Sequence, residues 1–190
     1  MKHRLFAAID LPDQVMSQVA KLQTELDKLG VPIVWEKPKQ LHLTLVFMGR
    51  LADEDAARVQ GMLVNTARTF RSHTLRMGDL DTLYNRHEPS ILFLQIIDLE
   101  GELVSLQKEL ARRVDEVTPQ PRQKFMPHIT IGRVRKSDPT QVKQFLERLS
   151  GVEIDSLGKF TVNQVHLYES FLSKSGASHV KLASFNLGNS

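Results

Sequence analysis

The chain has 190 residues, of which 41% are hydrophobic and 25% are charged, a composition typical of a folded soluble domain. It contains no cysteine, which excludes disulfides, cysteine-ligated zinc, iron–sulfur clusters and thiol nucleophiles. The longest apolar run, Leu5–Ile9, is far shorter than the about 20 residues of a membrane span or the about 7 to 15 of a signal-peptide core, so we expect a cytoplasmic protein without a membrane partner.

The net charge of +3 arises from 25 basic and 22 acidic residues, which are unevenly distributed. No carboxylate occurs between Glu36 and Asp53 or between Glu116 and Asp138, while both stretches contain several lysines and arginines. Strands are often poor in acidic residues, so this pattern is informative only if a functional motif lies in the same stretches. It would then favour an anionic ligand.

In chain order, the hydrophobic periodicity predicts alternating strands and helices. The expected strands are residues 4–11, 41–49, 74–83, 90–98, 128–134, 159–172 and 179–187. The expected helices are residues 13–29, 53–68, 102–117 and 139–149. Asp13 and Asp138 stand at two helix starts, each beside a proline, while Gly30 and Gly151 end the same helices. A long helix, a strand, a second helix and further strands occur once in each half, which indicates a loose internal repeat.

Two of the expected strands share a motif in which a histidine and a threonine alternate with aliphatic residues. Residues 42–45 read HLTL and residues 128–131 read HITI. Because side chains alternate along a strand, His42 and Thr44 share one face, and His128 and Thr130 do the same. One such motif is weak evidence, since a lone strand histidine is more often structural. Two copies, both in the stretches without carboxylates, predict that the polar faces converge on one cleft.

The residue types in these motifs favour acid–base chemistry on an anionic substrate. Imidazole titrates at about pH 6.5, so one ring can accept a proton while the other donates one. The lack of neighbouring carboxylates argues against Mg²⁺, and zinc would need a third ligand that neither strand supplies. A phosphodiester with an internal leaving group fits better, because hydroxyls and a guanidinium bind its phosphate. The residues therefore predict metal-free phosphodiester hydrolysis without a cofactor.

The two motifs resemble those of the 2H phosphoesterase superfamily, and further segments resemble its RNA 2′,3′-cyclic phosphodiesterase branch, also called 2′-5′ RNA ligase. These segments are RLFAAIDLP at 4–12, Trp35 with the LHLTLVFMG that follows, PHITIGR at 127–133, and HLYESFL at 166–172 followed by Gly176. The resemblance covers essentially the whole chain. It implies an α+β fold in which residues 1–190 form a single bilobal, pseudo-two-fold domain, with two antiparallel sheets facing a central cleft and helices packed outside.

The resemblance also implies an activity, the opening of RNA 2′,3′-cyclic phosphate ends to 2′-phosphates, with slow 2′-5′ ligation in reverse. Carried over by motif, His42 is the general acid for the O3′ leaving group and His128 is the general base for water, although the near symmetry of the motifs leaves the two roles open. Thr44 and Thr130 would hydrogen-bond the non-bridging oxygens, and Arg133 would neutralise them. The implied partner is RNA with such ends, in tRNA-like fragments or oligonucleotides, and we expect a monomer.

Three positions do not follow the motif pattern directly. By strict alternation Arg133 falls on the face opposite to His128, and it reaches the cleft only if Gly132 bulges or the strand ends there. By the same alternation, Phe47 falls on the face of its strand that carries Leu43 and Leu45, which we expect to be buried. His179 stands where the family resemblance implies an aromatic residue, which argues against a base-stacking contact from this position.

The remaining histidines lack a paired threonine, and we expect surface or packing roles for them. They are His3, His73, His87, His166 and His179. His166 differs from the others, because it alternates with Gln164 and Tyr168 on a polar strand face.

Other functions stay open at this point. A nucleotide-binding module could keep this fold and pocket without turnover, although binding alone does not require two proton carriers. A phosphodiesterase of different specificity would open small cyclic nucleotides, ADP-ribose-type cyclic phosphates or 2′-5′ oligoadenylates. The last alternative is an unrelated protein in which the two motifs occur by chance.

Overall fold

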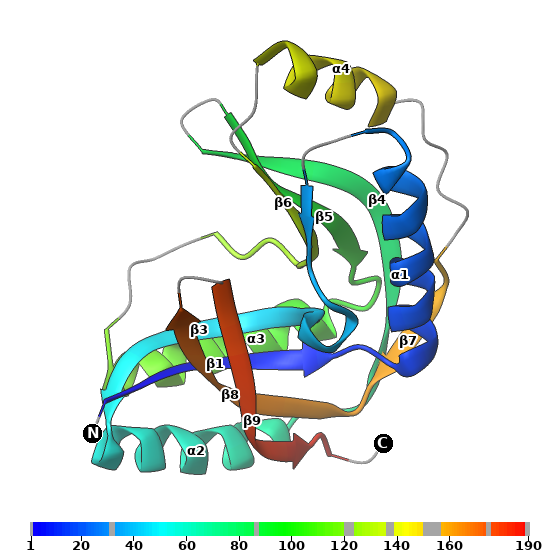
Figure 1. The fold of residues 1–190 in the computed structure, drawn as a ribbon. Coiled ribbons are helices and arrows are strands. Elements are labelled where there is room, and N and C mark those ends of the chain that lie inside the picture. The colour runs from blue at the N-terminus through cyan, green and yellow to red at the C-terminus, as the bar shows by residue number, and fades with distance from the viewer. Residues whose placement is uncertain are drawn as a thin grey trace.

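The computed structural model describes residues 2–30, 33–85, 88–119, 124–135, 139–149, 157–173 and 176–188. It shows a mixed α+β fold, which confirms the expected class (Figure 1). The strands are β1 (Lys2–Asp10), β2 (Ile33–Trp35), β3 (His42–Ala52), β4 (His73–Asn85), β5 (Glu88–Ile97), β6 (His128–Val134), β7 (Lys159–Val162), β8 (Gln164–Ser173) and β9 (Gly176–Asn186). The helices are α1 (Asp13–Asp27), α2 (Asp53–Ala67), α3 (Glu102–Val117) and α4 (Pro139–Leu149), with a short 3₁₀ helix, η1, at Pro38–Gln40.

The strands form one curled sheet in the order β7-β4-β5-β6-β3-β1-β8-β9, and β2 pairs with β6. This order is symmetric about the contact between β6 and β3, because β5 and β1, β4 and β8, and β7 and β9 occupy matching places. Figure 1 shows β4, β5 and β6 together in the upper half and β1, β3, β8 and β9 together in the lower half. The halves join at one antiparallel pair, Leu43 opposite Ile129. The two expected sheets are therefore continuous with each other.

The structure differs from the sequence prediction at two places. β2 and η1 were not predicted, because three residues are too few to show a periodicity. The strand expected at residues 159–172 is interrupted at Asn163, where β7 ends and β8 follows. β7 pairs with β4 and β8 pairs with β1, so the two pieces belong to opposite halves of the sheet. Asp138, Gly151 and His87 lie outside the described residues.

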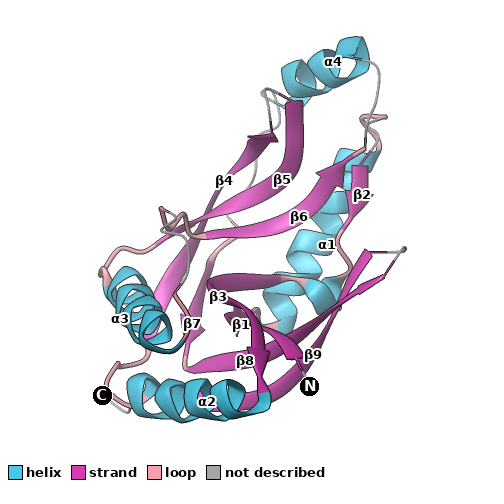
Figure 2. Cartoon of the chain, turned by 90° about the vertical axis from the view of Figure 1, so that its left-hand side faces the viewer, coloured by secondary structure: helices cyan, strands magenta, loops and turns pink. Residues whose placement is uncertain are grey.

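One face of the sheet is apolar and packs against the helices. Leu5, Ala7 and Ile9 of β1 belong to this core, whereas Phe6 and Ala8 point to the opposite face. α2 contacts α3 as well as β1, β3, β8 and β9, and Figure 2 shows α2 and α3 next to each other beside the sheet. We call the opposite face, which carries Phe6 and Ala8, the site face. Among the described residues, no helix has the length and apolar character that crossing a membrane requires.

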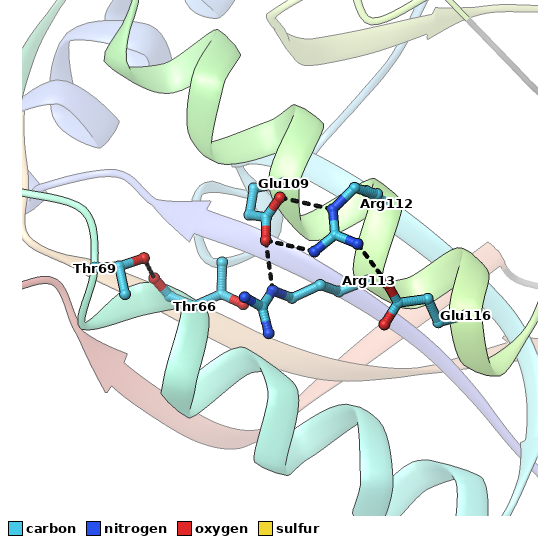
Figure 3. A network of polar contacts seen from close by, with 6 residues as sticks. All are labelled: Thr66, Thr69, Glu109, Arg112, Arg113 and Glu116. Carbon is cyan, nitrogen blue, oxygen red and sulfur yellow. Dashed lines mark hydrogen bonds and ion pairs between the residues drawn. The ribbon is translucent and has the colours of Figure 1, made fainter.

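The helices bury the stripes that periodicity predicted. In α1 and α3 the buried apolar residues are Val15, Val19, Leu22, Leu26, Leu103, Leu106, Leu110 and Val114. Away from the apolar stripe of α3, the Glu109 carboxylate accepts hydrogen bonds from Arg112 and Arg113, which lowers the pKa of Glu109 to about 2 (Figure 3). Exposed ion pairs of this kind contribute little to stability. The helices are therefore held chiefly by their apolar stripes.

β-bulges interrupt the alternation in β3 and β6 at the last residue of each motif. In β3, Thr44 pairs with Ala8 and Val46 pairs with Ala7, so Leu45 is an extra residue. Phe47, which pairs with Phe6, is thereby turned to the site face and is 58% exposed. The expectation that Phe47 is buried with the aliphatic residues of its strand is therefore wrong.

The bulge in β6 has the same consequence for Arg133. Phe93 pairs with Thr130 and Leu92 pairs with Gly132, so Ile131 is the extra residue. Ile91, two positions from Phe93 and on the same face of β5, pairs with Arg133. Arg133 therefore lies on the site face with Thr130. The bulge that turns it there occurs at Ile131, one residue before Gly132, where we expected it.

Gly132 occupies a place where β2 approaches β6 too closely for a side chain. A Cβ atom at this position would lie 2.5 Å from Cγ2 of Ile33 and 3.1 Å from the ring of Trp35.

We expect Gly132→Ala to reduce the free energy of unfolding by roughly 1–3 kcal/mol, because both neighbours would have to move. Urea denaturation would measure the change. The control is Gly61→Ala in α2, where no atom lies within 4 Å and a gain of up to about 1 kcal/mol is expected. Equal effects of the two changes would contradict this account.

Candidate active site

The structure brings the two predicted motifs together on the site face. Because Leu43 pairs antiparallel with Ile129, the adjoining positions place His42 beside Thr130 and Thr44 beside His128. All four polar side chains are partly exposed, while the aliphatic residues between them are buried. The site therefore presents two imidazoles and two hydroxyls around the centre of the pseudo-two-fold arrangement.

Both histidine rings are oriented by a backbone carbonyl two residues earlier in the chain. Nδ1 of His42 donates to the carbonyl oxygen of Gln40 at 2.6 Å, and Nδ1 of His128 donates to that of Met126 at 2.7 Å. The opposite ring nitrogen, Nε2, is then the one that can exchange a proton with a ligand. Since the geometry is the same in both strands, the tautomers do not distinguish an acid from a base.

The surroundings of the two rings differ. His42 lies among the rings of Phe6, Tyr168 and His179, with centroid distances of 5.1, 6.3 and 5.4 Å. Burial lowers the pKa of His42, because it disfavours the charged imidazolium, and the Gln40 carbonyl partly offsets this. His128 has an edge-to-face contact with Phe93, at a centroid distance of 5.2 Å.

Two carboxylates stand close to the site, contrary to the expectation from the sequence. Asp10 pairs with His42 across β1 and β3, and Glu36 follows β2. Both negative charges act to raise the pKa of His42 against the effect of burial. The sequence-based inference failed here because it considered only carboxylates near the motifs in the chain, whereas the sheet brings others beside them.

Asp10 is the centre of a polar network at the end of β1. Its carboxylate accepts hydrogen bonds from the hydroxyl of Tyr168 at 2.6 Å and from Nζ of Lys181, and Nε2 of His166 lies 3.6 Å away. These contacts lower the pKa of Asp10, although burial opposes the shift. The ring of Tyr168 stacks on Phe6, which in turn contacts His42, so the network supports the wall of the site.

Arg133 projects from β6 on the site face, and Glu36 fixes the base of its guanidinium. Nε of Arg133 donates to Oε1 of Glu36 at 2.9 Å, while the Arg133 side chain is 58% exposed. This contact leaves the two terminal nitrogens for an anion, and a guanidinium held in this way suits a phosphate oxygen pair. Arg133 therefore lies on the same face of the sheet as the two motifs.

His179 is a site residue that sequence reasoning missed. Its ring makes edge-to-face contacts with Phe6 and His42, and its Nδ1 is buried without a hydrogen-bond partner among the described residues. Burial lowers the pKa of His179, and the positive charges of His42, Arg4 and Arg133 lower it further. The one signal in the sequence was that the family resemblance led us to expect an aromatic residue at this position.

Two other histidines have structural roles, as expected. His3 lies away from the site face and bridges Asp53 and Glu169, with both distances at 2.8 Å. His73 is buried and its Nδ1 lies 3.1 Å from the carbonyl oxygen of Arg71. In the described ranges, no cluster of three or more histidine or acidic side chains is arranged to hold a metal ion.

Comparisons with known proteins agree with this architecture. The family model of the 2′-5′ RNA ligase superfamily matches residues 11–170, and the chain belongs to that superfamily. It is 27% identical over 183 residues to the RNA 2′,3′-cyclic phosphodiesterase of Archaeoglobus fulgidus, covering 96% of this chain and 99% of that protein. A protein of the same description from Thermotoga maritima is 27% identical over 173 residues, with coverage of 91% and 89%.

Solved structures show the same fold. The crystal structure of TT0787 from Thermus thermophilus superposes with a TM-score of 0.81 at 25% identity, covering 98% of each chain. That of Escherichia coli LigT complexed with 3′-AMP gives a TM-score of 0.77 at 22% identity, covering 98% of this chain and 99% of that chain. The 2H phosphoesterase fold that the motifs indicated is therefore confirmed.

Asp10→Asn should lower the pKa of His42 further, because the substitution removes a negative charge that favours the imidazolium. An NMR titration of the His42 ring would measure this shift. Tyr168→Phe is the control, since it removes a hydrogen bond to Asp10 without removing the carboxylate charge. A pKa that stays constant or rises in Asp10→Asn would show that Asp10 does not act on His42 in this way.

Proposed function

We propose that the protein hydrolyses 2′,3′-cyclic phosphate ends of RNA to 2′-phosphates, without a metal ion. The observation that carries the proposal is the pairing of Leu43 with Ile129 across β3 and β6, which brings the two motifs together, with Nδ1 of both His42 and His128 held by a carbonyl. Binding alone does not need two proton carriers in matched orientation. The similarity to proteins named RNA 2′,3′-cyclic phosphodiesterase supports the same activity.

In the proposed reaction, a water molecule attacks the phosphorus and the bond from phosphorus to O3′ breaks. His128 accepts a proton from the water at Nε2, and His42 donates a proton from Nε2 to the departing O3′. Thr44 and Thr130 donate hydrogen bonds to the non-bridging oxygens, and Arg133 neutralises their charge. Each proton transfer contributes about 10²- to 10⁴-fold to the rate.

The environment of His42 determines when it can act as the acid. Burial lowers its pKa in the free protein, so that the neutral ring predominates at neutral pH. A bound phosphodiester anion favours the charged imidazolium in the same way as Asp10 and Glu36 do. His42 thus acquires its catalytic proton together with the substrate.

The substrate class we propose is RNA oligonucleotides, including tRNA-like fragments, bound by a monomer. Ligation would follow the same step with a 5′-hydroxyl in place of water: its oxygen attacks the phosphorus of the cyclic end, the bond to O3′ breaks, and a 2′-5′ phosphodiester forms. His128 would accept the proton of the 5′-hydroxyl and His42 would protonate O3′, as in hydrolysis. The reverse of this step, the cleavage of a 2′-5′ bond by O3′, would use the two histidines in exchanged roles. The same groups serve both directions, because a general acid in one direction is a general base in the other.

Hydrolysis of a short RNA with a 2′,3′-cyclic phosphate end, in the presence of EDTA, tests the proposal. The wild type should produce the 2′-phosphate, and His42→Ala and His128→Ala should each lower kcat/KM by about 10²- to 10⁴-fold. Thermal melting of each variant would verify that it is folded. His3→Ala, a histidine change away from the site face, should retain the activity.

Other outcomes would identify a different function. If the wild type binds the RNA and does not open it, the protein is a nucleotide-binding module. If EDTA abolishes turnover, a metal takes part. Activity that survives both histidine changes would place the reaction elsewhere.

The two histidine roles can be separated with bis(p-nitrophenyl) phosphate, whose leaving group departs without a proton. If His42 is the acid, His42→Ala should retain most of its activity on this substrate, while His128→Ala should lose it. The reverse pattern would exchange the roles.

The rate of hydrolysis of the RNA substrate should depend on pH with a bell-shaped profile. If the bound substrate raises the pKa of the acid, the alkaline limb of kcat should lie at higher pH than that of kcat/KM.

A further inference from the structure

A pair of arginines lies on the site face beyond the catalytic motifs. Arg4 of β1 and Arg50 of β3 are directly opposite each other in the strand register, and both are exposed. Neither has an acidic partner among the described residues. Like charges in directly opposed positions of an antiparallel pair destabilise it. An anion bound between the two guanidinium groups would remove this repulsion.

The register fixes where this pair lies relative to the motif residues. Along β1, Ala8 pairs with Thr44, Phe6 pairs with Phe47, and Arg4 pairs with Arg50. Since residues two apart share a face, Arg4, Phe6 and Ala8 form one line on the site face. The arginines are four residues from the level of Thr44, or about 13 Å at about 3.3 Å per residue.

The surface between Thr44 and the arginines is aromatic. The ring of Phe47 is 58% exposed and lies 5.9 Å from that of Phe6. Exposed aromatic rings beside basic groups suit a single-stranded nucleic acid, whose bases stack on the rings while its phosphates meet the cations. Arg4 also lowers the pKa of His179, so its positive charge acts on a ring that contacts His42.

We propose that Arg4 and Arg50 bind one backbone phosphate of the substrate, on the 5′ side of the cyclic end that the histidines process. This inference rests on the proposed function and narrows its substrate class. A cyclic mononucleotide has a single phosphorus and cannot occupy both places, whereas an RNA chain can. The arginine pair therefore makes the protein selective for oligonucleotides over small cyclic nucleotides.

The test compares kcat/KM for 2′,3′-cyclic AMP with that for a penta-adenylate ending in a 2′,3′-cyclic phosphate. The wild type should prefer the pentamer, and the double variant Arg4→Gln/Arg50→Gln should lower the ratio of the two values by at least about tenfold, the size expected for losing hydrogen bonds to a charged group. The salt dependence for the pentamer should flatten by about 0.7 in slope for one phosphate contact. The control is Arg58→Gln on α2, whose arginine pairs with Asp55 and should leave the ratio unchanged.

The stability of the variant separates binding from folding. Because the substitutions relieve a like-charge pair, the double variant should melt at the same temperature as the wild type or higher. A wild type without preference for the pentamer, or a double variant that keeps the preference, would overturn the second phosphate site and leave the proposed hydrolysis intact. If the wild type opens neither substrate, the proposed function fails. In that case, fluorescence anisotropy would measure the affinity of the wild type and of the double variant for the pentamer. Equal affinities would exclude a phosphate site at Arg4 and Arg50.

Discussion

At the centre of the sheet, β3 and β6 meet at the antiparallel pair of Leu43 with Ile129, and both side chains are fully buried. The hydrophobic burial of these two residues fixes the relative position of the two halves. In an antiparallel pair the neighbouring residues on the other face are then determined, which puts His42 beside Thr130 and Thr44 beside His128. A shift of the pairing by one residue would turn one set of polar side chains into the core. The geometry of the site thus depends on apolar packing on the reverse side of the same strands.

The bulges complete this arrangement. In each motif strand one extra residue follows the threonine, Leu45 in β3 and Ile131 in β6, and it turns the residue two positions later to the site face. The pseudo-symmetric positions carry different chemistry, an exposed Phe47 in one half and Arg133 in the other. The symmetric frame therefore supports an asymmetric site. This suits a substrate whose phosphate oxygens need a cation and whose base needs an aromatic surface.

The hairpin of β8 and β9 distinguishes the environment of one histidine from that of the other. It supplies Tyr168 and His179 to the aromatic surroundings of His42. The Gln40 side chain donates a hydrogen bond to the carbonyl of Ala177 in β9 at 2.7 Å, while its own carbonyl holds His42. Burial lowers the pKa of His42, and the hairpin contributes two of the rings that surround it. The final part of the chain therefore influences the first motif more than the second.

The sequence by itself predicted the four helices and most of the strands, and it selected the four motif residues as candidates, because the alternation of strands and the apolar stripes of helices are local signals. Strict alternation could not assign Phe47 to the site face, since a bulge is set by the register between two strands and leaves little trace in one of them. Asp10 and Glu36 were unforeseen neighbours for a similar reason, because their proximity to His42 arises from sheet pairing between distant segments. His179 likewise joined the site only through the hairpin that places it on the His42 ring. The local sequence pattern thus determined which strands carry polar side chains on one face. The pairing of strands that are distant in the chain determined which of these side chains lie together in the site.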